Sequence, residues 1–145
     1  MGARSKARKR ALDILFESEL RGLPPGATLP ERQAAETPPV AEYTVTLIEG
    51  VIERLPEIDA TIAAYADGWA LERMPAVDRN ILRIGVYELE HVDSVPQGVV
   101  LSEAVSLASS LSTDESAAFV NGVLARIAEA APREAQPTET RVQPR

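Results

Sequence analysis

Apolar residues recur at the spacing of an amphipathic helix through most of this chain. In the segment 6–21 they form one stripe, as expected of a helix that buries a single face. Gly22 and the following Pro24-Pro25 end that helix, because glycine readily takes the left-handed cap conformation and proline breaks the next turn. A proline-rich linker, 22–39, comes next, and a short helix at 31–36 would have no core-facing apolar pattern to support it.

Two further helices follow the linker. Thr37 is a candidate N-cap for the first of them, with prolines in its first turn. Gly50 lies inside this helix at a cost of about 1 kcal/mol relative to alanine, so we expect a neighbouring element to pack closely against it. Pro56 begins the next helix, and Asp67-Gly68 ends it.

The third quarter of the chain carries the strongest helical pattern. Apolar groups in the segment 76–90 cover much of the helix circumference, which is typical of a central helix. A turn at 93–98 precedes another helix that ends near Leu111. Ser112 and Glu115 have the spacing of a capping box and predict the start of a last helix, in which Gly122 is expected to permit close packing.

No convincing strand pattern is present, so the predicted fold is all-α, a compact bundle of about six or seven helices. We expect one domain over 1–130. The segment 131–145 is polar and proline-rich and is expected to be a disordered tail. No run of about 18 apolar residues exists to span a membrane, and the N-terminus lacks the apolar core of a secretory signal, which favours a cytoplasmic location.

The composition excludes several kinds of active site. The sequence has no cysteine and one histidine, His91. Disulfides, thiolate metal sites and cysteine nucleophiles are therefore absent, and a metal site built on histidines is not expected. A Ser-His-Asp arrangement would have to use that single imidazole.

The charge is strongly polarised along the chain. The net charge is -7, yet the first ten residues hold five basic side chains and no acid. The basic residues are Arg4, Lys6, Arg8, Lys9 and Arg10. A cationic end on an anionic body often marks a local site for a polyanion.

Three stretches together resemble the NusB family. They are the basic opening helix with its apolar stripe at 7–16, the run VDRNILRIGVYEL at 77–89, and the segment 95–124, which ends in FVNGVL. The resemblance implies a helical domain of two packed subdomains that binds boxA, a single-stranded RNA element of ribosomal RNA transcripts. It also implies a small-subunit ribosomal protein that acts as NusE, and an RNA polymerase antitermination complex, as partners. A protein of this kind is not an enzyme and needs no cofactor.

The basic cluster is the first candidate site. Cations must line the phosphates of single-stranded RNA, and arginine can pair with a phosphate through two hydrogen bonds. Basic side chains at a helix N-terminus also oppose the helix dipole, a cost that favours a use for them. A solvated helix start is the alternative. The expected RNA ligands are Arg4, Lys6, Arg8, Lys9 and Arg10.

The resemblance adds residues from other helices. It implies that Phe16 lies near the RNA, where a base could stack on it, although Phe16 also lies on the core stripe. It also implies that Ser109, Ser110 and Phe119 approach the RNA beside the first helix, unless they only cap and pack a helix junction. The family often has lysine at position 109. Its absence here, with Asp114 and Glu115 nearby, predicts weaker RNA binding or greater dependence on the partner.

Asp78 is the candidate contact for the protein partner. The resemblance implies that an acidic residue at this position faces the basic ribosomal protein. The alternative is an acid that stabilises the start of its own helix through the helix dipole.

Three other hypotheses remain open at this stage. The chain could be a helical protein-interaction module without specific RNA binding. It could be an accessory domain related to RNA cytosine methyltransferases, although no cofactor-binding pattern follows the helical part. It could also form a homodimer that buries the basic helix.

Overall fold

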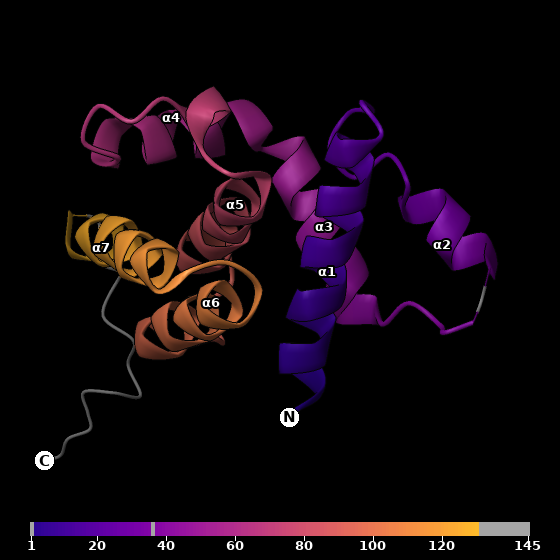
Figure 1. The fold of residues 1–145 in the computed structure, drawn as a ribbon. Helices are drawn as coiled ribbons and strands as arrows, with labels where there is room; N and C mark the ends of the chain where they lie inside the picture. Colours follow the sequence, from indigo (N-terminus) through magenta and orange to yellow (C-terminus); the bar gives the residue numbers. More distant parts are fainter. Residues whose placement is uncertain (1, 36, 131–145) are drawn as a thin grey trace, which may run out of the picture.

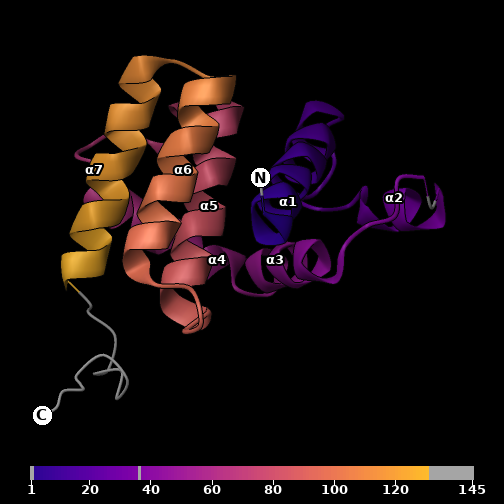
Figure 2. The ribbon, with the colours of Figure 1, turned by 90° about the horizontal axis from the view of Figure 1, so that it is seen from below.

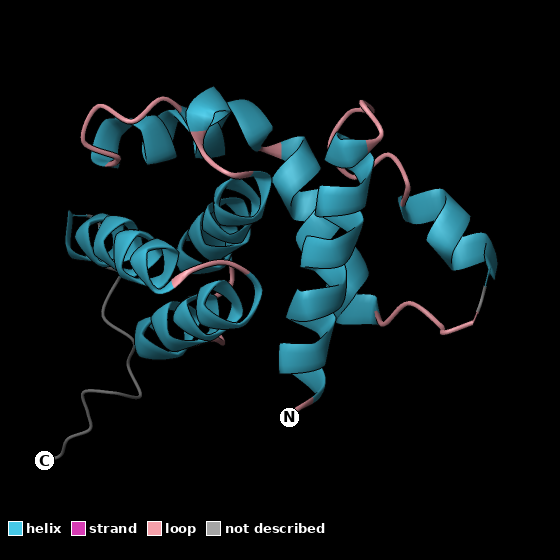
Figure 3. Ribbon diagram, in the orientation of Figure 1, coloured by secondary structure: helices cyan, strands magenta, loops and turns pink. Residues whose placement is uncertain are grey.

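The computed structural model describes residues 2–35 and 37–130, and that part of the chain is helical without any strand (Figures 1 and 3). This confirms the all-α prediction. In chain order the elements are α1 (Ala3–Leu20), α2 (Leu29–Ala35), α3 (Glu42–Glu53), α4 (Leu55–Tyr65), the 3-10 turn η1 (Leu71–Arg73), α5 (Ala76–His91), α6 (Gln97–Leu111) and α7 (Asp114–Ala130).

The helices pack in two groups around α5. Helices α1, α2 and α3 form one side of the molecule, and α4, α6 and α7 form the other (Figures 1 and 2). Helix α5 contacts α1, α3, α4, α6 and α7. Its side chains Ile81, Leu82 and Val86 are almost completely buried, because apolar groups lie on most of its circumference. The prediction of a central helix at 76–90 is therefore confirmed.

The end of α1 has the predicted cap. Gly22 has a φ of +72°, and the N–H of Leu23 donates to the carbonyl of Ser18 at 2.9 Å. Together with the bond from the Gly22 N–H to Glu19, this is the hydrogen-bond pattern of a Schellman motif. The motif turns the chain back toward α3.

The short helix in the linker does have a buried anchor. Leu29 begins α2 and is buried in the core. Thr28, the residue just before α2, bonds back to α1. Its hydroxyl lies 2.9 Å from that of Ser18, and both hydroxyls donate to the carbonyl of Ile14. The residues 31–35 themselves are not buried, as the sequence predicts, so Leu29 and Thr28 fix α2 to the core from its start.

Helix α3 begins later than the sequence predicts. Its N-cap is Ala41, in extended conformation, and not Thr37. The reason is steric, because a residue that precedes proline is disfavoured in the helical region. Thr37 precedes Pro38 and Pro38 precedes Pro39, so neither residue favours the helical conformation, and α3 begins only after Ala41.

Helix α7 also begins one residue later than predicted. Its first turn is capped by Thr113, whose Oγ1 accepts the N–H of Ser116 at 2.9 Å. The Ser116 hydroxyl is buried and donates to Asp78 Oδ2 at 2.7 Å. The capping box expected between Ser112 and Glu115 is therefore wrong, because this tertiary bond between α7 and α5 sets the helix register.

Glycines mark two close helix contacts, one of them predicted. A Cβ on Gly50 would lie 2.2 Å from the ring of Tyr87, so α3 and α5 approach closely there. A Cβ on Gly85 would lie 2.8 Å from Leu124, which identifies a similar approach of α5 and α7. At Gly122 the nearest atom would be 3.5 Å away, in Arg126, and the prediction of close packing at that glycine is wrong.

None of the helices within 2–35 and 37–130 is long and apolar enough to cross a membrane. The predicted tail, 131–145, lies outside the described residues.

Candidate nucleic-acid interface

The basic residues of α1 point to different sides of the helix. An α-helix has 3.6 residues per turn, so Arg4 and Arg8 share one face, while Lys6 and Arg10 share another. Arg4 and Arg8 both lie against the ring of Tyr43 in α3. The predicted cluster is therefore not a single continuous patch.

Arg8 is an interior residue. It is only 3% exposed, and its Nε lies 3.0 and 2.9 Å from the two carboxylate oxygens of Glu88 in α5. Its Nη1 lies 3.4 Å from Glu103 in α6. The Tyr43 hydroxyl donates to the same Glu88 carboxylate. Burial by itself lowers the pKa of Arg8, but the hydrogen bond and charge of Glu88 outweigh it and raise the pKa, so the guanidinium stays charged.

The prediction that Arg8 contacts RNA is thus corrected. A buried guanidinium with two carboxylate partners has no surface to offer a phosphate, and it joins α1 to α5 and α6 instead. Arg8 is a structural residue that holds the basic helix in place.

Arg4 is exposed and has partners at the edge of the same network. Its guanidinium lies 4.3 Å from the centre of the Tyr43 ring, within the range of a cation–π contact. Its Nη1 also donates to Ser94 at 3.3 Å, between α5 and α6. Both contacts are on the surface, so Arg4 retains access to solvent.

Lys6, Lys9 and Arg10 remain on the outer side of α1, and we refer to them as the outer cations. Lys6 is exposed and the other two are partly exposed. Lys9 pairs with Asp13 at 3.0 Å, an exposed ion pair of the kind that contributes little to stability. All three line a surface pocket of about 450 Å³ between α1 and the segment 38–44, whose other side is apolar.

The helix junction predicted to join this site lies at the other end of α5. Arg8, near the start of α1, bonds Glu88 near the end of α5. Asp78, in the first turn of α5, bonds Ser116 beside the α6–α7 junction. Ser109 and Ser110 are exposed there, six and seven residues beyond Glu103, which corresponds to about 10 Å along the helix. Neither serine is among the residues that line the pocket of the outer cations, so their contact with RNA stays a prediction.

The two predicted aromatic residues are both partly buried. Phe119 packs edge-on against Trp69, with ring centroids 4.7 Å apart and an interplanar angle of 72°. Phe16 lies on α1 eight residues after Arg8, about 12 Å along the axis. Both residues are intermediate in exposure, and RNA contact by Phe16 and Phe119 stays a prediction.

Asp78 has no exposed surface. It is completely buried, and its Oδ2 accepts the bond from Ser116. Its Oδ1 has no hydrogen-bond partner among the described residues. The predicted direct contact of Asp78 with a protein partner is therefore corrected, because the side chain helps to position α7 on α5. The exposed acids nearest in sequence to this bond are Asp114 and Glu115.

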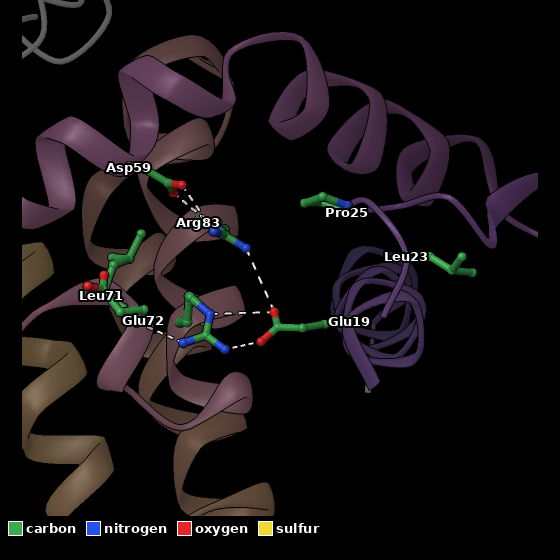
Figure 4. A pocket seen from close by; sticks show the side chains of 8 residues that line it. Glu19, Leu23, Pro25, Asp59, Leu71, Glu72 and Arg83 are labelled. Atoms are coloured by element: carbon green, nitrogen blue, oxygen red, sulfur yellow. Dashed lines mark hydrogen bonds and ion pairs between the residues drawn. The ribbon is translucent and has the colours of Figure 1, made fainter. Parts of the chain in front are cut away.

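A second polar network joins the end of α1 to α5 (Figure 4), and nothing in the sequence indicates that Glu19 and Asp59 belong to it. Glu19, at the end of α1, pairs with Arg79 and lies 3.9 Å from Arg83. Arg83 also bonds both carboxylate oxygens of Asp59 in α4, at 2.9 and 3.0 Å. Burial, followed by the charge of Arg83, lowers the pKa of Arg79. The available signal was a set of polar residues inside an otherwise apolar helix.

This network lines a second pocket, also of about 450 Å³. Glu19 and Asp59 enter it from opposite sides, and Arg83 lies between them, as Figure 4 shows. Arg79 additionally donates to the carbonyls of Leu71 and Met74, at 2.7 and 2.8 Å. Since these cations already have internal acceptors, they are less suited to binding an external anion than the outer cations are.

Both the sequence and the fold match those of known proteins. A family model described as the NusB family matches residues 5–129. The transcription antitermination protein NusB of Acidothermus cellulolyticus is 58% identical over 127 residues, which cover 88% of this chain and 88% of that protein.

Solved structures with the same fold include a complex with dsRNA and a crystal structure of an RNA supercoil. A chain in the crystal structure of antitermination factors NusB and NusE in complex with dsRNA is 31% identical, with a TM-score of 0.77, covering 88% of this chain and 97% of that one. A chain in the crystal structure of a plectonemic RNA supercoil is 33% identical, with a TM-score of 0.79, covering 90% of this chain and 96% of that one.

Proposed function

The chain belongs to the NusB family, and we propose that it is an RNA-binding adaptor for transcription antitermination that carries no catalytic activity. It binds boxA-type single-stranded RNA in ribosomal RNA transcripts, together with a small-subunit ribosomal protein that acts as NusE. The RNA and the two proteins then join the antitermination complex on RNA polymerase. This places the chain in the cytoplasm, where the transcript is made.

The observation that carries the RNA-binding role is the set of outer cations. Lys6, Lys9 and Arg10 lie on one side of a helix whose opposite side is fixed to the core by Arg8. A rigid helix with cations on its outer side can neutralise successive phosphates without a large ordering cost. Asp13 is the one acid on the rim of their pocket.

The charge of the rest of the protein supports a basic protein partner. Beyond residue 10 the chain holds 22 acidic and ten basic side chains. Asp114 and Glu115 are exposed at the start of α7, far along α5 from the outer cations. An acidic surface complements a ribosomal protein and repels RNA, so the two ligands occupy separate parts of the molecule.

The direct test is a fluorescence titration of the purified chain with three RNAs. They are a labelled boxA element, a scrambled single strand of equal composition, and a duplex of the boxA sequence, the last because a related structure contains dsRNA. The titration is run at two salt concentrations, with and without the ribosomal protein.

We expect preferential binding of single-stranded boxA that weakens with salt and tightens with the partner. Equal, weak binding of all three RNAs under every condition would contradict the adaptor role. It would favour instead the protein-interaction module, whose partner would meet the acidic surface. Binding of a methyl-donor cofactor by the pure chain would favour the methyltransferase relationship.

A further inference from the structure

We infer that the pocket between α1 and the segment 38–44 receives one nucleotide of the bound RNA. The base lies against the apolar wall that Pro38, Pro39 and Ala41 provide, and its flanking phosphates pair with Lys6 and Arg10. This inference rests on the proposed function and assigns the path of the RNA to the α3 side of α1.

The pocket has the size and the two-sided character that a nucleotide needs. Its volume, about 450 Å³, lies within the range of about 300–1,000 Å³ that is typical of small-molecule sites. The outer cations form one rim, and the opposite wall is made of proline and alanine side chains. A nucleotide has the matching halves, since its phosphates are anionic and its base is flat and largely apolar on both faces.

The pocket is also held in shape before any ligand arrives. Thr44 lies in its lining and donates through Oγ1 to the carbonyl of Ala7 at 2.9 Å. That bond ties the first turn of α3 directly to α1. Pro38 and Pro39 have fixed φ angles, so their wall loses little entropy on binding. A preformed site of this kind binds more tightly than one that must be ordered.

Charge favours this side of α1 over the α6 side. The outer cations, with Asp13 as the one acid among the lining residues, surround the pocket. On the α6 side, Arg8 is already paired with Glu88 and Glu103, and no basic residue lies between 104 and 125. Arg4 is the one exposed cation described on the α6 side, so the larger group of available cations lies beside the pocket.

The lining also indicates how the base is recognised. The Thr44 hydroxyl already donates to Ala7, and the apolar wall carries no side-chain hydrogen-bonding group. The pocket therefore contributes affinity through shape and apolar contact. Exchange of one base for another at this position is expected to matter little, whereas removal of the base is expected to matter much.

The test fills the pocket without changing any charge. Ala41→Phe places a large side chain in the pocket from an exposed N-cap position, and Ala3→Phe does so from the first turn of α1. The matched control is Ala64→Phe, on an exposed position of α4. Each protein is titrated with labelled boxA RNA and with a series of boxA RNAs that each lack a single base, and thermal unfolding verifies the fold.

We expect both pocket variants to bind boxA RNA about five-fold or more weakly than the control, because the added ring excludes the base; this factor corresponds to about 1 kcal/mol. One abasic position should weaken binding to the wild type and leave binding to Ala41→Phe unchanged. Undiminished affinity of both folded pocket variants would overturn the inference while the RNA-binding role stands. Failure of the wild type to prefer boxA would instead overturn the proposed function, and the inference with it.

Discussion

Arg8 and Arg10 are two residues apart in the same helix and have opposite roles. Two residues correspond to about 200° around a helix. Arg8 therefore turns inward to Glu88 and Glu103, whereas Arg10 lines the outer pocket beside the segment 38–44. One arginine fixes the helix to the core, and the other is available to an anionic ligand.

The difference teaches that a run of basic residues is not itself a binding site. Which cations remain available depends on the helical phase and on acids that other helices present. Glu88 lies 80 residues after Arg8, so nothing in the local charge pattern indicates the pair. A binding site and its structural support can thus share one short segment of sequence.

The largest effect should come from removing Arg8, the arginine that turns inward. Arg8→Ala leaves the Glu88 carboxylate buried without its cation, and removing one partner of a buried ion pair typically costs about 3–5 kcal/mol. Chemical denaturation should show a loss of this size in the free energy of unfolding. An unchanged midpoint would contradict the structural role of Arg8.

A double variant separates the stability lost through packing from the stability lost through an unpaired charge. Arg8→Met with Glu88→Gln removes both charges together and keeps an acceptor for the Tyr43 hydroxyl. We expect it to recover most of the lost stability, since neutral replacement of a buried pair is often close to neutral in free energy. If the double variant were as unstable as Arg8→Ala, the loss would arise from packing and not from an unpaired charge.

The second prediction concerns Tyr43, which bonds the same carboxylate. Tyr43→Phe removes a hydrogen bond to a charged group and should cost about 1.5–3 kcal/mol near neutral pH. Burial, and then the bond to Glu88, raise the pKa of Tyr43 well above its ordinary value of 10.0. Above about pH 10 the unfolded chain therefore loses this proton while the folded protein keeps it, and the free energy of unfolding falls.

The measurement for Tyr43 is the difference between wild type and Tyr43→Phe from pH 8 to pH 11. Other groups titrate in both proteins, so their contribution largely cancels. The stability advantage of the wild type should shrink as the pH rises through 10. A difference that stays constant over this interval would show that Tyr43 titrates normally in the fold.

The third prediction concerns Lys6 and Arg10, two of the outer cations. Lys6→Ala with Arg10→Ala should lower the affinity for boxA RNA at least about ten-fold, because hydrogen bonds to charged groups contribute about 1.5–3 kcal/mol each. Stability should change by less than about 0.5 kcal/mol, as is usual for surface substitutions. Arg73→Ala, on η1 at the far end of α5, is the control for loss of a cation.

The smallest effect is expected at the α6–α7 junction. Ser109→Lys adds a cation at an exposed site that lies away from the outer cations. If the RNA follows the α3 side of α1, the affinity for boxA should change by less than about two-fold, which corresponds to roughly 0.4 kcal/mol. A clear gain in affinity, with an increased salt dependence, would indicate that the RNA passes the junction instead.

Periodicity predicted the helical framework well. The central helix, its apolar circumference and the glycine cap of α1 were all visible as local patterns. Errors arose where local rules competed with other contacts. Consecutive prolines delayed α3, and the bond from Ser116 to Asp78 moved the start of α7 by one residue.

The candidate site could be predicted only in part. The sequence identified the basic segment but not which of its residues are buried and which line a pocket. Glu88 and the segment 38–44, which decide this, approach α1 only in the folded chain. The same limit applies to Asp78, which resembles a surface acid in sequence and is completely buried in the structure. The RNA contacts of Arg4, the outer cations, Phe16, Ser109, Ser110 and Phe119, and the homodimer, stay predictions.

The salt dependence of boxA binding tests the central claim most directly. For single-stranded RNA, each neutralised phosphate contributes a slope of about -0.7 to the dependence of log K on log salt. Arg10→Ala should reduce the slope by about that amount, whereas the Arg8→Met, Glu88→Gln double variant should keep the slope of the wild type. A loss of slope in the double variant and none in Arg10→Ala would show that the assignment of the inward and outward arginines is reversed.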